Sequence, residues 1–237
     1  MTPRALGITV GVIAFFDALL ISGSGPYADR WHAFPDTSAR IARIISDLGY
    51  TVTVREDVES ALAYPGPCRL LVVNIGNPSK PRPAEAIEAA RSGLENHLAA
   101  GGSLLGIHVS ATSLTTMAEW ASILGGHWIR GQSMHPPQAE TMISITSTDH
   151  PITAGLADFT INDERYSYLQ TNPDICVLCE HNFDGIRHPV VWSRETETYR
   201  VAYDGLGHDT TSYDSVGHVE LFRRAVRWLL HDPVDDH

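Results

Sequence analysis

Apolar and polar positions along the first half of the chain predict strands and helices in alternation. Short apolar runs have the length of strands covered on both faces, and between them apolar residues recur at the three- and four-residue spacing of helices. The predicted strands are residues 18–21, 51–54, 70–75 and 103–107, and the predicted helices include one carrying Ile41, Ile44, Ile45 and Leu48, then 84–100 and 112–124. This order requires crossover connections and therefore predicts a mostly parallel sheet flanked by helices.

The second half of the chain has a different pattern, with several short stretches in which apolar and polar residues alternate. Such alternation is typical of strands with one face covered. The stretches are residues 140–147, 159–163, 175–180, 189–193 and 200–203, and a last amphipathic helix is predicted at 216–230. We therefore expect an α/β fold whose parallel sheet carries an antiparallel extension at one edge.

A length of 237 residues fits one α/β domain, which we place at residues 18–232. Residues 1–17 are predicted to be an N-terminal extension and 233–237 a C-terminal tail. Arg4 followed by an apolar stretch resembles a secretory signal, but Asp17 interrupts the stretch and no cleavage motif follows. The stretch is also too short to span a bilayer. The sequence therefore predicts a cytoplasmic protein without a membrane segment.

The charge of the chain narrows the class of partner. The formal net charge is -11, and no stripe of Lys and Arg is present that could neutralise nucleic acid or anionic lipid. The three cysteines include Cys176 and Cys179, which would point to opposite faces of one strand, so a disulfide between them is geometrically awkward. We expect thiols in a reducing compartment and a small molecule as the partner.

Two histidines follow predicted strands and are the first candidates for chemistry. His108 ends the strand at 103–107, in a segment shaped like the elbow that presents a catalytic Ser or Cys in some hydrolases. Neither a thiol nor a hydroxyl stands at that point. His208 lies between Gly207 and Asp209, just after the strand at 200–203, where it can exchange protons or bind a ligand. The alternative is that His108 is a hydrogen-bonded core residue and that the second segment only forms a turn.

Glu164 and His135 are weaker candidates, because acidic clusters and loop histidines are usually solvated. A metal site would need His108, His135 and His208 to converge from distant loops, and no H-x-x-x-H or H-E-x-x-H motif supports one. We therefore assign no metal ligand, with a divalent ion such as zinc kept as the alternative. No nucleotide-binding glycine motif is complete. Among the remaining histidines, the predicted surface residues include His181, His188 and His218.

The order of several short motifs resembles the trehalose-utilisation (ThuA-like) family. These are Gly106-Ile107-His108, Gly125-Gly126, His135-Pro136 with Gln138, His150-Pro151-Ile152 with Gly155-Leu156, Asp163-Glu164 with Tyr166, Pro189-Val190-Val191-Trp192 and Gly207-His208-Asp209. The resemblance implies a three-layer, flavodoxin-like sandwich of the class I glutamine amidotransferase type, with His108 in place of the glutaminase cysteine. It also implies a pocket containing His32, His108, His135, Glu164 and His208, although the loop around His32 departs from the usual pattern.

The family's association with sugar catabolism predicts a carbohydrate-derived ligand. In the leading hypothesis the chain is an isomerase or hydrolase, not a glutaminase, with His108, His208 and Glu164 as the catalytic residues. The predicted substrate-binding residues are Trp31, His32, His135, Gln138, Tyr166 and Asp209. The alternative is a non-catalytic ligand-binding module that has lost its nucleophile. The sequence is compatible with a homo-oligomer and does not name the substrate.

Overall fold

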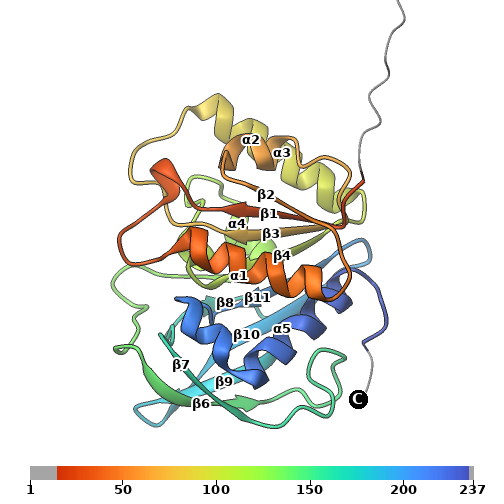
Figure 1. Ribbon diagram of the computed structural model, residues 1–237. Helices are drawn as coiled ribbons and strands as arrows, with labels where there is room; N and C mark the ends of the chain where they lie inside the picture. The colour runs from red at the N-terminus through yellow and green to blue at the C-terminus, as the bar shows by residue number, and fades with distance from the viewer. Residues whose placement is uncertain (1–14, 235–237) are drawn as a thin grey trace, which may run out of the picture.

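A nine-stranded mixed sheet forms the centre of the molecule, with helices on both faces (Figure 1). The computed structural model describes residues 15–234, so the predictions for most of the N-terminal extension and the end of the tail lie outside the described residues. The sheet order is β2-β1-β3-β4-β11-β10-β9-β6-β7. The strands are β1 (Ala18–Ser22), β2 (Val52–Arg55), β3 (Leu70–Asn74), β4 (Ser103–Ile107), β6 (Ala139–Ile145), β7 (Phe159–Asp163), β9 (Cys176–Phe183), β10 (Ile186–Glu195) and β11 (Arg200–Asp204).

The helices and a second small sheet complete the fold. Strands β5 (Gly126–His127) and β8 (Gln170–Thr171) pair with each other outside the main sheet. The α-helices are α1 (Phe34–Asp47), α2 (Val58–Ala63), α3 (Ala84–Ala99), α4 (Trp120–Leu124) and α5 (Val216–Leu229), and the 3-10 helices are η1 (Gly25–Tyr27), η2 (His108–Thr112) and η3 (Thr210–Asp214).

Five strands make up the parallel half of the sheet. β1 pairs with β2 and β3, β3 pairs with β4, and β4 pairs with β11, all in parallel. Every residue of β1, β3 and β4 is buried, which explains why these strands read as continuous apolar runs. The predicted α/β class and three-layer arrangement are confirmed.

The other four strands form the predicted antiparallel extension. β10 is antiparallel to β11, β9 to β10, β6 to β9 and β7 to β6. These successive reversals make β7 run in the same direction as β11 and the parallel strands. The carboxyl end of β7 therefore lies at the same edge of the sheet as the carboxyl ends of β1, β4 and β11, and this topology brings the candidate residues together.

Alternating residues of the parallel strands feed two separate hydrophobic cores. Leu20 and Val72 face one side, where they pack with residues of α1 and α5. Leu19 and Leu71 face the other side, where they pack with α2, α3 and α4. Trp192, fully buried in the second core, donates a hydrogen bond from its indole nitrogen to the carbonyl of Leu124, 2.8 Å away.

The prediction of a helix at residues 112–124 is wrong over most of that range. Only Trp120–Leu124 is α-helical, after the 3-10 turn of η2 and an irregular stretch. Ser113 donates its hydroxyl to the carbonyl of Ile75 at 2.6 Å, and the Trp120 indole donates to the carbonyl of Ser110 at 2.8 Å. These tertiary hydrogen bonds hold the segment in a non-helical path because a hydroxyl side chain competes with the helical ladder.

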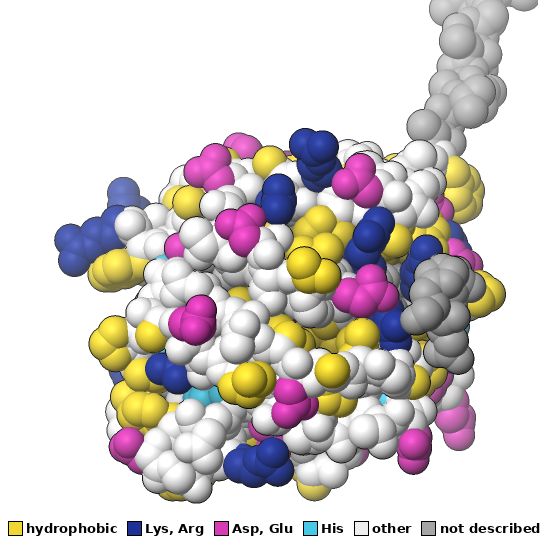
Figure 2. Space-filling view, turned by 60° about the horizontal axis from the view of Figure 1, so that its bottom comes forward, with side chains coloured by type: hydrophobic (Ala, Val, Ile, Leu, Met, Phe, Trp, Pro, Cys, Tyr) yellow, Lys and Arg dark blue, Asp and Glu magenta, His cyan; other side chains and the backbone are white. Residues whose placement is uncertain are grey.

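The surface shown in Figure 2 has acidic and basic side chains interspersed. Lys and Arg side chains are scattered among the acidic ones on this face instead of forming one stripe. This arrangement differs from the continuous basic surface with which proteins follow a nucleic-acid backbone. Among residues 15–234, no helix combines the length and the apolar character needed for a membrane crossing.

Candidate active site

Four side chains from distant parts of the chain meet at the carboxyl edge of the sheet. His32 lies between η1 and α1, His108 directly follows β4, Glu164 follows β7 and His208 follows β11. One nitrogen of each imidazole and one carboxylate oxygen of Glu164 all lie within 4.8 Å of one another. We call these four residues the His/Glu cluster. In parallel sheets this edge is where ligands bind.

His108 stands at a strained turn between β4 and η2. Its φ is +39°, in the left-handed region that residues other than glycine seldom adopt. The hydroxyl of Tyr203 donates to the carbonyl of His108 at 2.7 Å, and the His108 Nδ1 lies 2.8 Å from the carbonyl of Gly205. A Cβ on Gly106 would come within 2.5 Å of Leu124. The elbow shape predicted from the sequence is therefore present, with an imidazole where hydrolases carry a nucleophile.

Glu164 lies at the centre of the histidines. Its carboxylate oxygens are 3.8 Å from His108 Nε2, 3.2 Å from His208 Nδ1 and 3.4 Å from His135 Nδ1. Burial alone would raise the pKa of this carboxyl, but the surrounding imidazoles His108, His208 and His135 lower it below its usual value. Glu164 is therefore ionised at neutral pH.

The two strand-end histidines respond to this carboxylate in opposite directions. Burial works against the charged form of His108, but Glu164, Asp163 and the Gly205 carbonyl outweigh it and raise the pKa of His108. For His208, burial and the neighbouring His108 lower the pKa despite the attraction of Glu164. When a proton enters the cluster it therefore goes to His108 in preference to His208.

Asp163 fixes the loop that carries His208. This carboxylate, fully buried at the end of β7, accepts hydrogen bonds from the backbone N–H groups of Gly207 at 2.7 Å and His208 at 3.2 Å. It also accepts the hydroxyl of Ser212 at 2.6 Å and the N–H of Glu164 at 2.8 Å. One side chain thus positions both Glu164 and His208. Sequence analysis missed this role of Asp163. The available signal was that every second residue of β7, namely Phe159, Ile161 and Asp163, faces inward.

Asp29 orients His32 in a similar way. Its carboxylate oxygens lie 2.9 and 2.8 Å from His32 Nδ1 and also accept the backbone N–H groups of Trp31 and His32. The pKa of Asp29 is lowered, since the contacts with His32 and these N–H groups outweigh the cost of burial. Sequence analysis assigned Asp29 no role, and its position three residues before His32 was the only signal.

A cavity of about 540 Å³ lies beside the cluster. His32, Glu164 and the predicted substrate residues Trp31, His135 and Tyr166 line it, and sequence analysis missed its lining residue Trp128. The Tyr166 ring lies 4.2 Å from the His108 ring, centroid to centroid, at a tilt of 32°, and meets the Trp128 ring edge-on at 4.8 Å. Trp31 is largely exposed at the rim. Aromatic faces and polar groups together suit a small polar ligand with apolar ring faces.

Gln138 and Asp209, also predicted to bind substrate, lie outside the lining of this cavity. The Gln138 amide donates to the Asp209 carboxylate at 3.0 Å, and Asp209 caps η3 by accepting the N–H of Thr211 at 2.8 Å. Both side chains therefore have an observed structural role, which joins the 135–138 loop to the loop after β11.

The prediction of surface positions for three other histidines is wrong. His181, His188 and His218 are all buried. His181 and His188 lie opposite each other on β9 and β10, with ring centroids 5.4 Å apart. His218 pairs with the buried carboxylate of Asp204 at 2.9 Å. Sequence analysis missed these positions because cross-strand pairing and helix docking bring the partners from far along the chain.

Protonation of His181 and His188 is expected to destabilise the fold. Burial lowers the pKa of both residues in the folded state, with Arg165 adding to the effect on His181 and Glu180 opposing it at His188. Both imidazoles therefore favour folding when neutral, and their contribution is present above the unfolded pKa of about 6.5 and lost as the pH falls below it. Urea unfolding at a series of pH values should show wild type losing stability on acidification more steeply than His181→Gln/His188→Gln; equal slopes would contradict the assignment.

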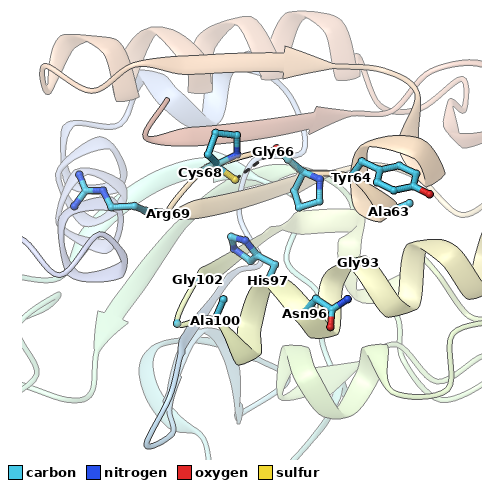
Figure 3. A pocket seen from close by; sticks show the side chains of 13 residues that line it. Ala63, Tyr64, Gly66, Cys68, Arg69, Gly93, Asn96, His97, Ala100 and Gly102 are labelled. Atoms are coloured by element: carbon cyan, nitrogen blue, oxygen red, sulfur yellow. Dashed lines mark hydrogen bonds between the residues drawn. The ribbon is translucent and has the colours of Figure 1, made fainter. Parts of the chain in front are cut away.

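A second cavity, of about 590 Å³, lies at the opposite end of the sheet, before β3 and β4 (Figure 3). It contains Cys68 and His97, a combination that elsewhere serves nucleophilic catalysis. Burial raises the pKa of the Cys68 thiol to about 11, so the thiolate is scarce at neutral pH. His97 Nε2 faces the carbonyl of Ser103 at 3.2 Å, and burial lowers its pKa. Despite its larger volume, this cavity lacks an activated nucleophile.

Comparison with known proteins places the chain in a family. The model of the ThuA family, described as trehalose utilisation, matches residues 20–229. The chain belongs to the ThuA family. The match runs from within β1 to the end of α5 and so includes every member of the His/Glu cluster. No curated protein matches the chain.

Solved structures support the same ThuA fold. A ThuA-like protein from Parabacteroides merdae superposes with a TM-score of 0.78 at 17% identity, covering 94% of this chain and 93% of that one. A ThuA-like protein from Bacteroides uniformis gives 0.73 at 19% identity, covering 94% and 95%. A GMP synthase subunit from Thermoplasma acidophilum gives 0.57 at 13% identity, covering 92% and 96%. At these identities the likeness shows the fold alone.

Proposed function

We propose that this ThuA-family chain is a cytoplasmic enzyme of sugar catabolism that acts on a carbohydrate-derived small molecule. The observation that carries the proposal is an ionised carboxylate, Glu164, at the wall of a cavity of about 540 Å³. This carboxylate lies within 4 Å of three imidazoles, of which His135 lines the same cavity. Titratable groups with perturbed pKa values gathered in one cleft are characteristic of acid–base catalysis.

The arrangement supports a division of roles. A sugar hydroxyl or carbonyl placed against the cluster is close to groups that accept and donate protons, with Glu164 as the carboxylate partner of His108 and His208. His135 and the aromatic rings of Trp128 and Tyr166 line the cavity and hold the sugar ring. The reaction class that fits these groups is an isomerisation or a hydrolysis by proton transfer. Glutamine hydrolysis is disfavoured because His108 occupies the elbow.

A substrate screen tests the proposal. The purified protein would be screened by thermal shift against sugars and keto sugars, and each stabilising compound would then be incubated with the protein and analysed for products by NMR. We expect at least one compound both to stabilise the protein and to be converted. For that compound, His108→Ala and His208→Ala should each lower kcat by about 10²-fold or more, the scale of a lost proton-transfer group.

Two outcomes count against the proposal. Turnover that is unaffected by both replacements would place the chemistry elsewhere. Stabilisation by sugars without any conversion would favour the rival function, a ligand-binding module built on a scaffold that has lost its nucleophile, for which the imidazole at the elbow is the supporting observation.

A further inference from the structure

Three buried imidazole nitrogens of the His/Glu cluster have no hydrogen-bond partner. They are Nε2 of His32, Nε2 of His108 and Nδ1 of His208. Buried polar atoms in native proteins are nearly always paired, so each unpaired atom needs an explanation. One nitrogen of each of these three rings and one oxygen of Glu164 lie within 4.8 Å of one another, so the rings converge on one point. Their common position indicates a missing occupant.

The hydrogen-bond partners of Nδ1 in His32 and His108 show whether Nε2 of each ring carries a proton. His32 Nδ1 is held by the Asp29 carboxylate at 2.8 Å, and His108 Nδ1 by the Gly205 carbonyl at 2.8 Å. Because both partners only accept, each neutral ring carries its proton on Nδ1 and directs the lone pair of Nε2 into the cluster. A carboxylate or carbonyl behind a histidine in this way is the usual support of a metal-binding imidazole.

The identity of the occupant follows from the chemistry of these atoms. A water molecule donates two hydrogen bonds, and a single proton on His108 satisfies one nitrogen. Neither matches the inward lone pairs of His32 and His108 together with a carboxylate and a third imidazole nitrogen, whereas a divalent cation can be bound by all four groups. Imidazole with carboxylate is a ligand set of zinc and related transition metals, while magnesium and calcium prefer oxygen alone.

We propose that His32, His108, Glu164 and His208 together bind one divalent transition-metal ion, with zinc as the best match. The inference deepens the proposed function and rests on it only for the reaction, because binding can be measured without a substrate. His32 and Glu164 line the cavity, so the ion is within reach of a ligand there. A metal-bound water or sugar hydroxyl is more acidic than a free one. With the ion bound, His108 and His208 would be its ligands instead of the proton-transfer groups proposed above, and His135, beside Glu164 at 3.4 Å, would be the group placed to accept a proton.

Metal analysis of the full chain tests the proposal. The protein purified without a metal-affinity tag should contain about one equivalent of transition metal by mass spectrometry. After removal of the metal with a chelator, Zn²⁺ titrated by calorimetry should bind with about the same stoichiometry and raise the unfolding temperature. Co²⁺ in place of Zn²⁺ should give visible absorption bands that report its ligands directly.

Variants distinguish the ligands from their neighbours. His32→Ala, His108→Ala and His208→Ala should each weaken Zn²⁺ binding by about 100-fold or more and change the Co²⁺ bands, and Asp29→Asn should weaken it about 10- to 100-fold. The control is His135→Ala, which removes a histidine beside the same carboxylate and should bind Zn²⁺ within about 3-fold of wild type. Circular dichroism should be used to check that each variant is folded. If an alanine variant does not fold, Asp29→Asn still tests the site, because it keeps all four ligands.

The outcomes separate this inference from the proposed function. No uptake of Zn²⁺ or Co²⁺ by the metal-free protein would overturn the metal site, and so would equal losses in His135→Ala and His108→Ala. Turnover that continues at the full rate after complete removal of metal would overturn the role of the ion in the reaction, while leaving the proposed function standing. Stoichiometric metal without conversion of any sugar would instead support the metal site and count against the proposed function.

Discussion

Asp163→Ala is expected to lower the free energy of unfolding by about 3–5 kcal/mol, the cost of removing one partner from a buried charged network. The carboxylate is fully buried and accepts hydrogen bonds from Gly207, His208, Ser212 and Glu164. Its removal leaves these donors without an acceptor in a space that water does not fill freely. Urea unfolding monitored by circular dichroism gives the difference in stability.

Asp158→Ala is the matched control for Asp163→Ala. Asp158 also accepts a backbone N–H, that of Ile145 at 2.8 Å, but it is exposed. Its replacement should cost about 1 kcal/mol, the net value of one hydrogen bond. Asp163→Asn keeps the shape of the side chain but supplies a weaker acceptor, so its loss of unfolding free energy should lie between those of Asp163→Ala and Asp158→Ala. If Asp163→Ala cost no more than Asp158→Ala, the carboxylate would not be the support of this loop.

The parallel half of the fold could be predicted from the sequence because its strands depend on local patterns. Residues 70–75 and 103–107 form uninterrupted apolar runs, and a buried parallel strand needs nothing more specific. The segment 112–124 was mispredicted because its conformation depends on distant partners. The carbonyl of Ile75 and the close packing of Trp120 decide its path, and neither can be read from the spacing of its own residues.

The candidate site was partly predictable for a similar reason. His108 and His208 follow parallel strands, whose carboxyl ends share an edge, so their proximity follows from topology. Glu164 depends on the direction of β7, which only the full order of the antiparallel strands fixes. The same register buries Asp163 beneath the loop of His208. Gln138 and Asp209 belong to two of the motifs that resemble the family and are predicted to bind substrate, but their mutual hydrogen bond appears only when the two loops are placed side by side.

Glu164→Gln is expected to reduce kcat on a confirmed substrate by about 10²- to 10⁴-fold. The amide has nearly the same shape as the carboxylate but no charge, so it neither attracts a proton toward His108 nor supplies an anionic ligand. The pH dependence of kcat should change as well as its value, because the charge of Glu164 raises the pKa of His108.

Glu180→Gln provides the comparison for Glu164→Gln. Glu180 is a partly buried carboxylate that faces Arg187 at 3.4 Å on the β9–β10 hairpin and is not a member of the His/Glu cluster. It should keep the activity of wild type within about 2-fold. Steady-state kinetics on both variants, with unfolding temperatures measured in parallel, separates catalysis from stability. A fully active Glu164→Gln enzyme with an unchanged pH profile would show that the carboxylate takes no part in the reaction, whatever residues surround it.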